Sequence, residues 1–548
     1  MRRGQVTPDR LQAYAARAGV RAAVLVVALG FFAVEGLVAA RTNTPTVDEF
    51  VYVPAGYYHL RTGDFGLEST NPPFLKMAMA LPLLAMDMQL DADPRWRDNR
   101  SGWGAWIFGT RFMETNSGRY LDAFFAARSV VLALGVGLGA LVFQRARVLL
   151  SPLAALATVV LYATMPPLLA HSAVATLDVG VTLLLFAAFI VAERFAETGS
   201  TRLAGLTGIL LGLALATKGI AMVFLPLAAV LVAAAWRAWD AAGVRRLVRG
   251  AVVMGVGAWV ALVAAYGFSG FPLPAPLVDG IRFQLAARSS GEFPAFLNGH
   301  WSQTGWWYYY LVAFGLKTPL ATLALVAVGL VAVARGALRD PRDRWLVVPP
   351  LFLLYVMSFH YGKNYGVRYL LPAFPFLLLI AGRGVDVLLG RDPRAVAAVA
   401  ALLVWQLAAC ATTGPHQLAY FNEMIAGPER ARHVLLDSNL DWGQDLGRLK
   451  AWLDARGTSR ICLGYFGHVD PHVYGIDFSL PPPSPAPGLC AVSANFLAGY
   501  PYAITYAGDR ILGVRQGAWS WFDRYRPLAR VGQSIYVFDV TAADVAAR

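Results

Sequence analysis

The sequence predicts an all-α polytopic membrane protein of about eleven transmembrane helices, followed by a C-terminal soluble α/β domain. Two observations predict this fold class. Hydrophobic residues make up 57% of the 548 residues and charged residues only 15%, whereas soluble domains average roughly 25% charged residues. The apolar residues also gather in blocks of about 17–25, the length that spans hydrocarbon as a helix.

The expected spans occupy residues 1–413, which form the predicted transmembrane domain. A basic segment precedes an apolar run from Val20 to Ala40, and this run lacks a cleavage site, so we expect it to stay as an anchor. The spans are expected at residues 20–40, 124–143, 151–169, 173–192, 203–217, 219–235, 251–268, 307–333, 345–359, 369–389 and 395–413.

Arginine clusters set the expected orientation of the spans. With the N-terminus inside, the inner connections hold clusters such as Arg145 with Arg147 and Arg245 with Arg246, and the short outer connections hold few cations. An odd number of spans then places the chain after Thr413 outside. These clusters account for most of the net charge of +13, so no nucleic-acid partner is expected.

Two outer segments are longer than a connection requires. In residues 41–123, a Pro-Pro pair precedes an expected helix from Phe74 to Met86, which is too short to span comfortably. In residues 269–306 prolines are frequent, and the aromatic run from Trp306 to Tyr310 is interpreted as an interfacial belt. The sequence therefore predicts structure outside the membrane before the tail begins.

The tail, residues 414–548, returns to a soluble composition. A helix is expected from Ser438 to Ala455 and strands at residues 460–466, 489–496 and 534–540, which together predict a small α/β domain. The run of polar residues at 437–441 is interpreted as turn and cap residues that pack the tail on the membrane part; the alternative is that the tail binds the acceptor. Cys462 and Cys490 lie in two of the strands, and they either pair in an oxidising compartment or remain buried thiols.

Ionisable residues gather near the outer ends of the spans, where their cost at membrane depth makes them candidates for function. The carboxylates are Asp48, Glu49 and Asp178, and the cations are Lys76, Lys218, Lys317 and Arg368. A sugar carried on a lipid phosphate has its reactive carbon at such a surface. A carboxylate can take the proton of an attacking hydroxyl, and a cation can bind the departing phosphate.

Several motifs at these positions resemble those of GT-C class glycosyltransferases. They are Asp48-Glu49 with Asn71-Pro72-Pro73, Thr176-Leu177-Asp178, Lys317-Thr318-Pro319 and Arg368-Tyr369-Leu370-Leu371-Pro372. Within that class the sequence is similar to the protein O-mannosyltransferase and lipid A aminoarabinose transferase superfamily. The resemblance implies transfer from a polyprenyl-phosphate sugar with inversion, and it implies that Asp48 is the general base or a carboxylate that orients the acceptor, with Glu49 beside it. Aminoarabinose transferases carry Glu-Lys before Pro-Pro, where this chain has Thr70-Asn71, so the donor sugar is left open.

The predicted function is that of a glycosyltransferase in the bacterial inner membrane. It moves a monosaccharide from a polyprenyl-phosphate carrier to a hydroxyl on a lipid, glycan or protein at the extracytoplasmic face. No residue spacing predicts a built-in metal site, and a divalent ion that bridges Asp48 or Asp178 to the phosphate stays open. The alternative is a lipid-linked-sugar transporter or flippase, although the sequence predicts neither discontinuous helices nor a halfway symmetry.

Overall fold

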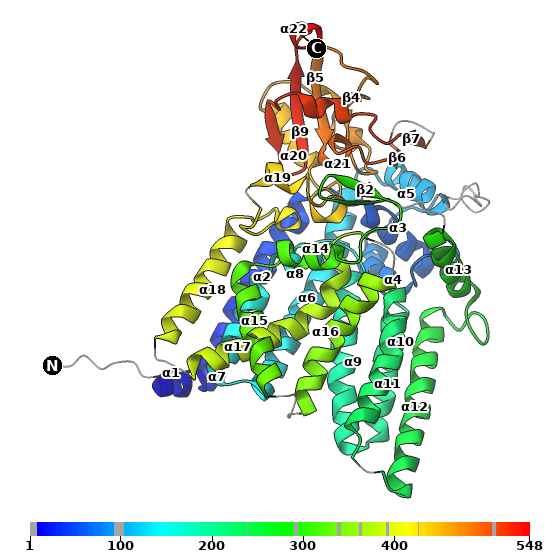
Figure 1. Cartoon of the computed structure of the whole chain (residues 1–548). Helices are drawn as coiled ribbons and strands as arrows, with labels where there is room; N and C mark the ends of the chain where they lie inside the picture. The colour runs from blue at the N-terminus through cyan, green and yellow to red at the C-terminus, as the bar shows by residue number, and fades with distance from the viewer. Residues whose placement is uncertain are drawn as a thin grey trace, which may run out of the picture.

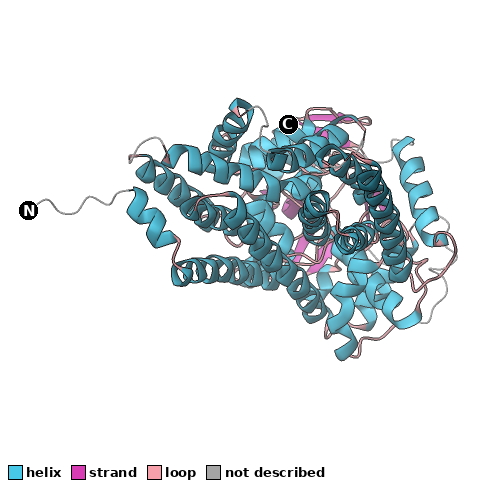
Figure 2. Cartoon of the chain, turned by 90° about the horizontal axis from the view of Figure 1, so that it is seen from below, coloured by secondary structure: helices cyan, strands magenta, loops and turns pink. Residues whose placement is uncertain are grey.

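The structure, a computed structural model, describes residues 8–91, 103–237, 239–289, 294–336, 341–360, 364–390, 394–425, 427–506 and 511–547. Helices form the body of the molecule, and the strands of the tail lie together beyond one end of it (Figure 1). Seen from below, the helices of the body face the viewer and the strands lie behind them (Figure 2). The helical body and the tail sheet therefore form separate layers.

Each of the eleven expected spans coincides with a helix or with two consecutive helices. They are α2 (Ala18–Thr42), α6 (Tyr120–Leu149), α7 (Pro152–Ala163) with α8 (Pro166–Ser172), α9 (Asp178–Thr198), α10 (Thr201–Leu215), η3 (Gly219–Val223) with α11 (Phe224–Ala235), α12 (Ala241–Ala265), α14 (Tyr309–Lys317) with α15 (Leu320–Arg335), α16 (Pro341–Phe359), η4 (Val367–Ala373) with α17 (Phe374–Leu389), and α18 (Ala395–Ala411). A short helix, α1 (Pro8–Ala15), precedes them. Among the described residues, five helices are long and apolar enough to cross a membrane, or seven if each bent pair is one span. The helices therefore confirm an integral membrane protein.

Two of these spans are broken, so the expectation of continuous helices is wrong at these places. α7 and α8 meet at 54°, and α14 and α15 meet at 117°. Pro166 and Pro167 begin α8, and Pro319 directly precedes α15. Proline lacks the N–H that a continuous helix needs but is well suited to start a new one. Each break is therefore explained by its prolines.

The two long outer segments carry their own elements. These are α3 (Val47–Thr62), α4 (Phe74–Ala80), η1 (Leu81–Ala85) and α5 (Gly104–Thr115) in the first, and α13 (Ala275–Ser289), β1 (Ala295–Leu297) and β2 (His300–Ser302) in the second. The helix predicted after the Pro-Pro pair is confirmed as α4 with η1. A capping box of Thr46 and Glu49 begins α3, which fixes the direction in which the first segment leaves α2.

A five-stranded sheet forms the centre of the tail, in the order β4-β3-β5-β9-β8. Its strands are β3 (Arg460–Gly464), β4 (Asp477–Ser479), β5 (Gly488–Ser493), β8 (Ala529–Val531) and β9 (Ile535–Val540). β3 is parallel to β4 and β5, whereas β9 is antiparallel to β5 and β8. The three strands predicted from the sequence are confirmed as β3, β5 and β9.

Shorter elements surround this sheet. They are η5 (Gln417–Ala419), α19 (Pro428–Ala431), η6 (Asp437–Asn439), α20 (Leu446–Asp454), η7 (Pro471–Tyr474), α21 (Ala494–Leu497), β6 (Tyr502–Ile504), β7 (Leu512–Val514), η8 (Ser520–Arg524) and α22 (Ala542–Ala546). β6 and β7 form a separate antiparallel pair. The tail is thus an α/β structure, as the alternation of elements in the sequence predicts.

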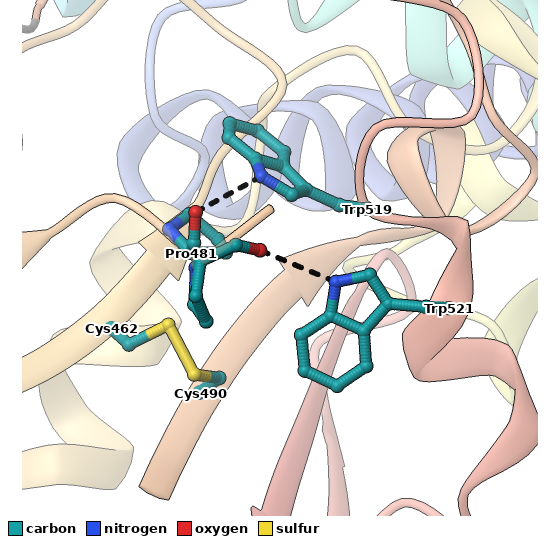
Figure 3. The surroundings of a disulfide bond; sticks show 6 residues. Cys462, Pro481, Cys490, Trp519 and Trp521 are labelled. Carbon is teal, nitrogen blue, oxygen red and sulfur yellow. Dashed lines mark hydrogen bonds between the residues drawn. A yellow bond between two sulfur atoms is a disulfide. The ribbon is translucent and has the colours of Figure 1, made fainter. Parts of the chain in front are cut away.

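A disulfide joins Cys462 of β3 to Cys490 of the neighbouring strand β5 (Figure 3). Of the two alternatives that the sequence leaves open, pairing is the one found. In the same view, the indole N–H groups of Trp519 and Trp521 donate to the carbonyls of Pro481 and Pro482, at 3.2 and 3.3 Å. The proline-rich loop is therefore tied to η8 next to the disulfide.

The helix predicted from Ser438 is wrong at its start, because α20 begins only at Leu446. Side chains in this stretch bond to their own backbone instead. Asp441 accepts from the N–H of Gly443 at 3.2 Å, and Gln444 accepts from the N–H of Trp442 at 2.8 Å. Local bonds of this kind compete with the helical hydrogen bonds. Residues 437–445 consequently form an irregular loop, which we call the tail loop.

One hydrophobic core joins the tail to the first outer segment. Phe50 and Phe112 from the outer segment belong to the same buried cluster as Trp442, Phe466 and Val537 from the tail. Trp442 is among the largest fully buried side chains of the protein. Burial of such aromatic side chains dominates the energetics of a core. The tail is therefore packed onto the helical body at the first outer segment, with the tail loop between them.

Candidate active site

An ion pair between distant parts of the chain marks the centre of the candidate site. Asp48 lies in the first turn of α3, and Arg368 lies in η4, which leads into α17. The Nη1 atom of Arg368 is 2.5 Å from Oδ2 of Asp48. The guanidinium carbon lies 5.1 Å from the centre of the Tyr369 ring and 4.4 Å from that of Trp442. Arg368 is thus held by one carboxylate and two aromatic faces.

A second ion pair lies next to the first. Asp178 begins α9, and Lys218 lies in the turn between α10 and η3. The Nζ atom of Lys218 is 2.5 Å from Oδ1 of Asp178, and it lies 4.4 Å from the centre of the Tyr369 ring. Tyr369 therefore contacts both cations. Four of the seven residues singled out in the sequence meet around this ring.

Glu49 lies beside Asp48 in the chain but faces a different partner. Its carboxylate binds Nε and Nη2 of Arg128 at 2.7 and 2.8 Å, and it also accepts the N–H of Ala175 at 2.6 Å. Glu49 is fully buried, and Arg128 is nearly so. This pair links α3, α6 and the turn before α9, so the geometry favours a structural role for Glu49.

Lys76 on α4 uses its donors within the first outer segment. Its Nζ atom donates to the carboxylate of Glu68 and to the carbonyls of Glu68 and Asn71, the last two at 2.7 and 2.8 Å. The side chain of Lys76 is fully buried. Because an ammonium group has three donors, this arrangement leaves none for a phosphate.

Lys317, at the end of α14, contacts the tail. Its Nζ atom donates to the carbonyls of Leu418 and Asn439 at 2.9 and 2.5 Å. It also lies 4.4 Å from the centre of the Phe421 ring. The structure therefore places Lys317 as a link between α14 and the tail, and it does not bring this cation to the two ion pairs.

Two residues of the tail loop belong to the site, although the sequence analysis interpreted this stretch as turn and cap residues. Trp442 packs on Arg368, and Asp437 lies within reach of the charges of Asp48 and Arg368. Burial raises the pKa of the Asp437 carboxyl to about 6; Arg368 opposes this rise and Asp48 adds to it. No periodicity or spacing in the sequence shows that a residue of the tail meets Asp48 and Arg368, because this contact depends on the tertiary fold.

A cavity of about 250 Å³ adjoins Lys218. Apolar side chains from η3 and α13 contribute to its lining, together with polar residues. The lining includes Thr70, Asn71, Lys218, Ile220, Leu277 and Ile281. A larger cavity of about 450 Å³, with Glu197, Arg237 and Arg342 in its lining, contains none of the predicted site residues. The smaller cavity therefore has the chemistry suited to an apolar chain that ends in an anion.

A metal ion was left open by the sequence. Within the ranges that the structure describes, no group of three or more His, Cys, Asp and Glu side chains is arranged to hold one. The carboxylates of Asp48 and Asp178 already bind Arg368 and Lys218. Both carboxylates are therefore bound by cations, and the centre of the site consists of two ion pairs.

Comparisons with solved structures find two of ArnT from Cupriavidus metallidurans. One is in the apo state and the other is bound to undecaprenyl phosphate. Each is 14% identical to this chain, and each match covers 96% of this chain and 99% of the other. The TM-scores are 0.47 and 0.46. A comparison with curated proteins gives no match.

A family model matches residues 120–265, which run from α6 to the end of α12. Its description is dolichyl-phosphate-mannose-protein mannosyltransferase. The matched stretch contains Asp178 and Lys218, the second ion pair of the site. Over these residues the chain is thus similar to that family, which supports the resemblance to protein O-mannosyltransferases predicted from the sequence; of the motifs quoted there, Thr176-Leu177-Asp178 lies within the match.

Proposed function

We propose that the protein is a membrane glycosyltransferase that moves a monosaccharide from a polyprenyl-phosphate carrier to a hydroxyl acceptor. The observation that carries this proposal is the meeting of two carboxylate–cation pairs around Tyr369, next to an apolar cavity. Lys218 lines the cavity, so a lipid chain that fills it brings its phosphate to this ammonium group. The family match over residues 120–265 supports the same class of donor.

In the proposed reaction the phosphate of the donor binds Lys218 and Arg368, which Asp178 and Asp48 hold beside Tyr369. Arginine suits this task because its planar fork binds two oxygens of one anion. The acceptor oxygen bonds to the anomeric carbon while the bond from that carbon to the phosphate oxygen breaks. The phosphate leaves with the electron pair, and the two cations stabilise its growing charge. A single displacement of this kind inverts the anomeric carbon.

The acceptor hydroxyl loses a proton in this step, so the reaction needs a carboxylate near the anomeric carbon. Asp48 is the candidate from the sequence, and Asp437 of the tail loop is a second carboxylate that interacts with Arg368. Asp178 supports the site through Lys218. Lys76 and Lys317 hold the surrounding backbone, because their hydrogen bonds go to carbonyls and to Glu68.

The transporter alternative is less consistent with the charges of the site. Transporters place their substrate groups near the midplane, at helix breaks related by an internal symmetry. Here the two ion pairs lie where α3, α9 and η4 begin, on the face that carries the tail. The breaks at Pro166 and Pro319 lie in the third and eighth spans, and prolines account for both.

We infer that the site and the α/β domain of residues 414–548 face the extracytoplasmic side of the bacterial inner membrane. The arginine clusters of the opposite connections support this orientation. The Cys462–Cys490 disulfide supports it as well, because disulfides persist in oxidising compartments outside the cytoplasm.

Sugar release by the purified full-length protein tests the proposal. A panel of radiolabelled polyprenyl-phosphate hexoses and pentoses would be offered with lipid, glycan and peptide acceptors. We expect transfer from at least one donor, with loss in Arg368→Met and Lys218→Met. The matched control is Asp122→Asn, an exposed change at the start of α6. Movement of the intact donor across a vesicle membrane without cleavage would favour the transporter instead.

A further inference from the structure

The tail loop is bound to η4, the element that carries Arg368. Ser438 Oγ donates to the carbonyl of Tyr365 at 2.9 Å, and Asn439 Oδ1 accepts the N–H of Val367 at 3.0 Å. Between them lies Gly366, with a φ of +92°, where an added Cβ would be 2.4 Å from Ser438 Oγ. A side chain at this position would therefore collide with Ser438 Oγ, so the tail loop packs closely against the residue before η4.

These contacts bring Asp437 next to the guanidinium group. The carbonyl of Tyr365 accepts from Ser438 Oγ and also from Nε of Arg368, at 3.3 Å. Asp437, directly before Ser438, is fixed by its own N–H, which donates to Asn495 Oδ1 at 3.0 Å. Its φ of +56° is a conformation that few residues other than glycine adopt. A strained residue held in place from two sides suggests a function for its side chain.

Asp48 and Asp437 both interact with Arg368, but they differ in their partners. Asp48 forms the ion pair with Nη1 of Arg368. In the described part of the chain, Asp437 forms no ion pair within 4 Å, and its carboxylate accepts a backbone hydrogen bond from Ser438. A carboxylate bound to a cation is a weaker base than one without such a partner. Asp437 is also half-buried, so part of this residue is exposed.

We propose that Asp437 is the carboxylate that takes the proton from the acceptor hydroxyl, while Asp48 holds Arg368 for the donor phosphate. This inference rests on the proposed function. As the acceptor oxygen bonds to the anomeric carbon, its proton passes to Asp437, and the electron pair of the broken bond leaves with the polyprenyl phosphate. Asp437 then returns the proton to water. The donor would thus enter from the cavity beside Lys218 and the acceptor from the tail.

The surroundings of Asp437 suit a base that works near neutral pH. Burial and Asp48 of α3 raise its pKa, and Arg368 of η4 lowers it, to give about 6. The other groups that face it are the hydroxyls of Tyr309, Tyr365, Tyr369, Tyr500 and Tyr502. These hydroxyls are neutral at that pH, so the charged neighbours are Asp48 and Arg368. A base with a pKa near the working pH is the most effective.

The test compares Asp437→Asn with Asp48→Asn in the full-length protein, using a donor and acceptor that are active with the wild type. Asparagine tolerates a positive φ, so the loop keeps its conformation. We expect kcat of Asp437→Asn to fall by about 10²-fold or more, with KM for the donor unchanged. The fall in activity of the wild type below about pH 6 should disappear in this variant. Asp48→Asn should instead raise KM for the donor.

Two further measurements separate this role from a structural one. Binding of polyprenyl phosphate alone, followed by tryptophan fluorescence, should be unchanged in Asp437→Asn and weakened in Asp48→Asn. Asp477→Asn, an exposed change on β4 of the same tail, should match the wild type in every assay. If Asp437→Asn keeps the wild-type rate and pH profile, the inference is overturned and the proposed function stands. The same holds if Asp437→Asn loses polyprenyl phosphate binding and activity in parallel. A wild type inactive with every donor would overturn both.

Discussion

Replacing Glu49 with glutamine is expected to destabilise the fold instead of only stopping the reaction. Oε1 of Glu49 accepts from Arg128 Nε and from the N–H of Ala175. Oε2 accepts from Arg128 Nη2 and from both the N–H and the hydroxyl of Thr46. Whichever way a glutamine amide is turned, its NH2 group faces two or three of these donors. An NH2 group cannot accept a hydrogen bond, so these donors lose their acceptor.

The expected loss of stability in Glu49→Gln follows from the buried charge of Arg128, which remains without a carboxylate partner. Arg128 is 2% exposed and would lose its only carboxylate partner among the described residues. Removing one partner of a buried ion pair costs about 3–5 kcal/mol. At about 2 °C per kcal/mol, the lower end for large domains, the apparent Tm should fall by about 6–10 °C.

The assay is thermal unfolding of detergent-purified protein, followed by tryptophan fluorescence at one fixed scan rate, because membrane proteins of this size unfold irreversibly. Asp122→Asn is the control. Asp122 also lies on α6 and pairs with Arg41, but these side chains are 60% and 61% exposed, so the loss should stay below about 1 kcal/mol. An unchanged Tm in Glu49→Gln together with lost transfer would refute the structural role and return Glu49 to the chemistry.

Three other changes test the tail. Cys462→Ser should lower the free energy of unfolding by about 3–4 kcal/mol, because the bond to Cys490 closes a sequence separation of 28 residues; a reductant should then lower the Tm of the wild type but not of the variant. Burial raises the pKa of Asp441 from 3.8 to about 8, so the folded state binds this proton more tightly and stability should fall as pH rises between these values. Asp441→Asn should show a flatter dependence of Tm on pH, and equal slopes would contradict this. Lys317→Met leaves the carbonyls of Leu418 and Asn439 without their donor, at about 1–3 kcal/mol each, and should speed proteolysis of the tail; an unchanged cleavage rate would argue against this link.

Much of the fold follows from hydrophobic patterns that a single sequence displays. The spans are long apolar blocks, and β3, β5 and β9 lie where short β-branched and aromatic runs occur. The breaks before Pro166 and Leu320 were missed because a proline within an apolar block does not show whether the helix kinks or starts anew. The start of α20 was missed because side chains of the tail loop bind their own backbone, an outcome that helical spacing does not exclude.

The site was also predictable only in part, because the sequence does not show tertiary contacts. The sequence could select buried ionisable residues, but it could not tell which way each one faces. Glu49 follows Asp48 on α3, and adjacent residues of a helix point about 100° apart, so one reaches Arg128 and the other Arg368. Lys76 and Lys317 are buried cations as expected, yet they bind backbone carbonyls. Whether a lysine binds a carbonyl or a ligand depends on tertiary contacts.

The shared core of the first outer segment and the tail also governs how the chain can be made. Phe50 and Phe112 are translated early, whereas Trp442 and Val537, which complete their packing, come some three hundred or more residues later. At roughly 5–20 residues per second, this interval lasts on the order of 15–60 s. During this time the early apolar surface has left the ribosome without its final partner. Biogenesis therefore requires that the membrane or a folding factor shield α3 and α5 until the C-terminus arrives.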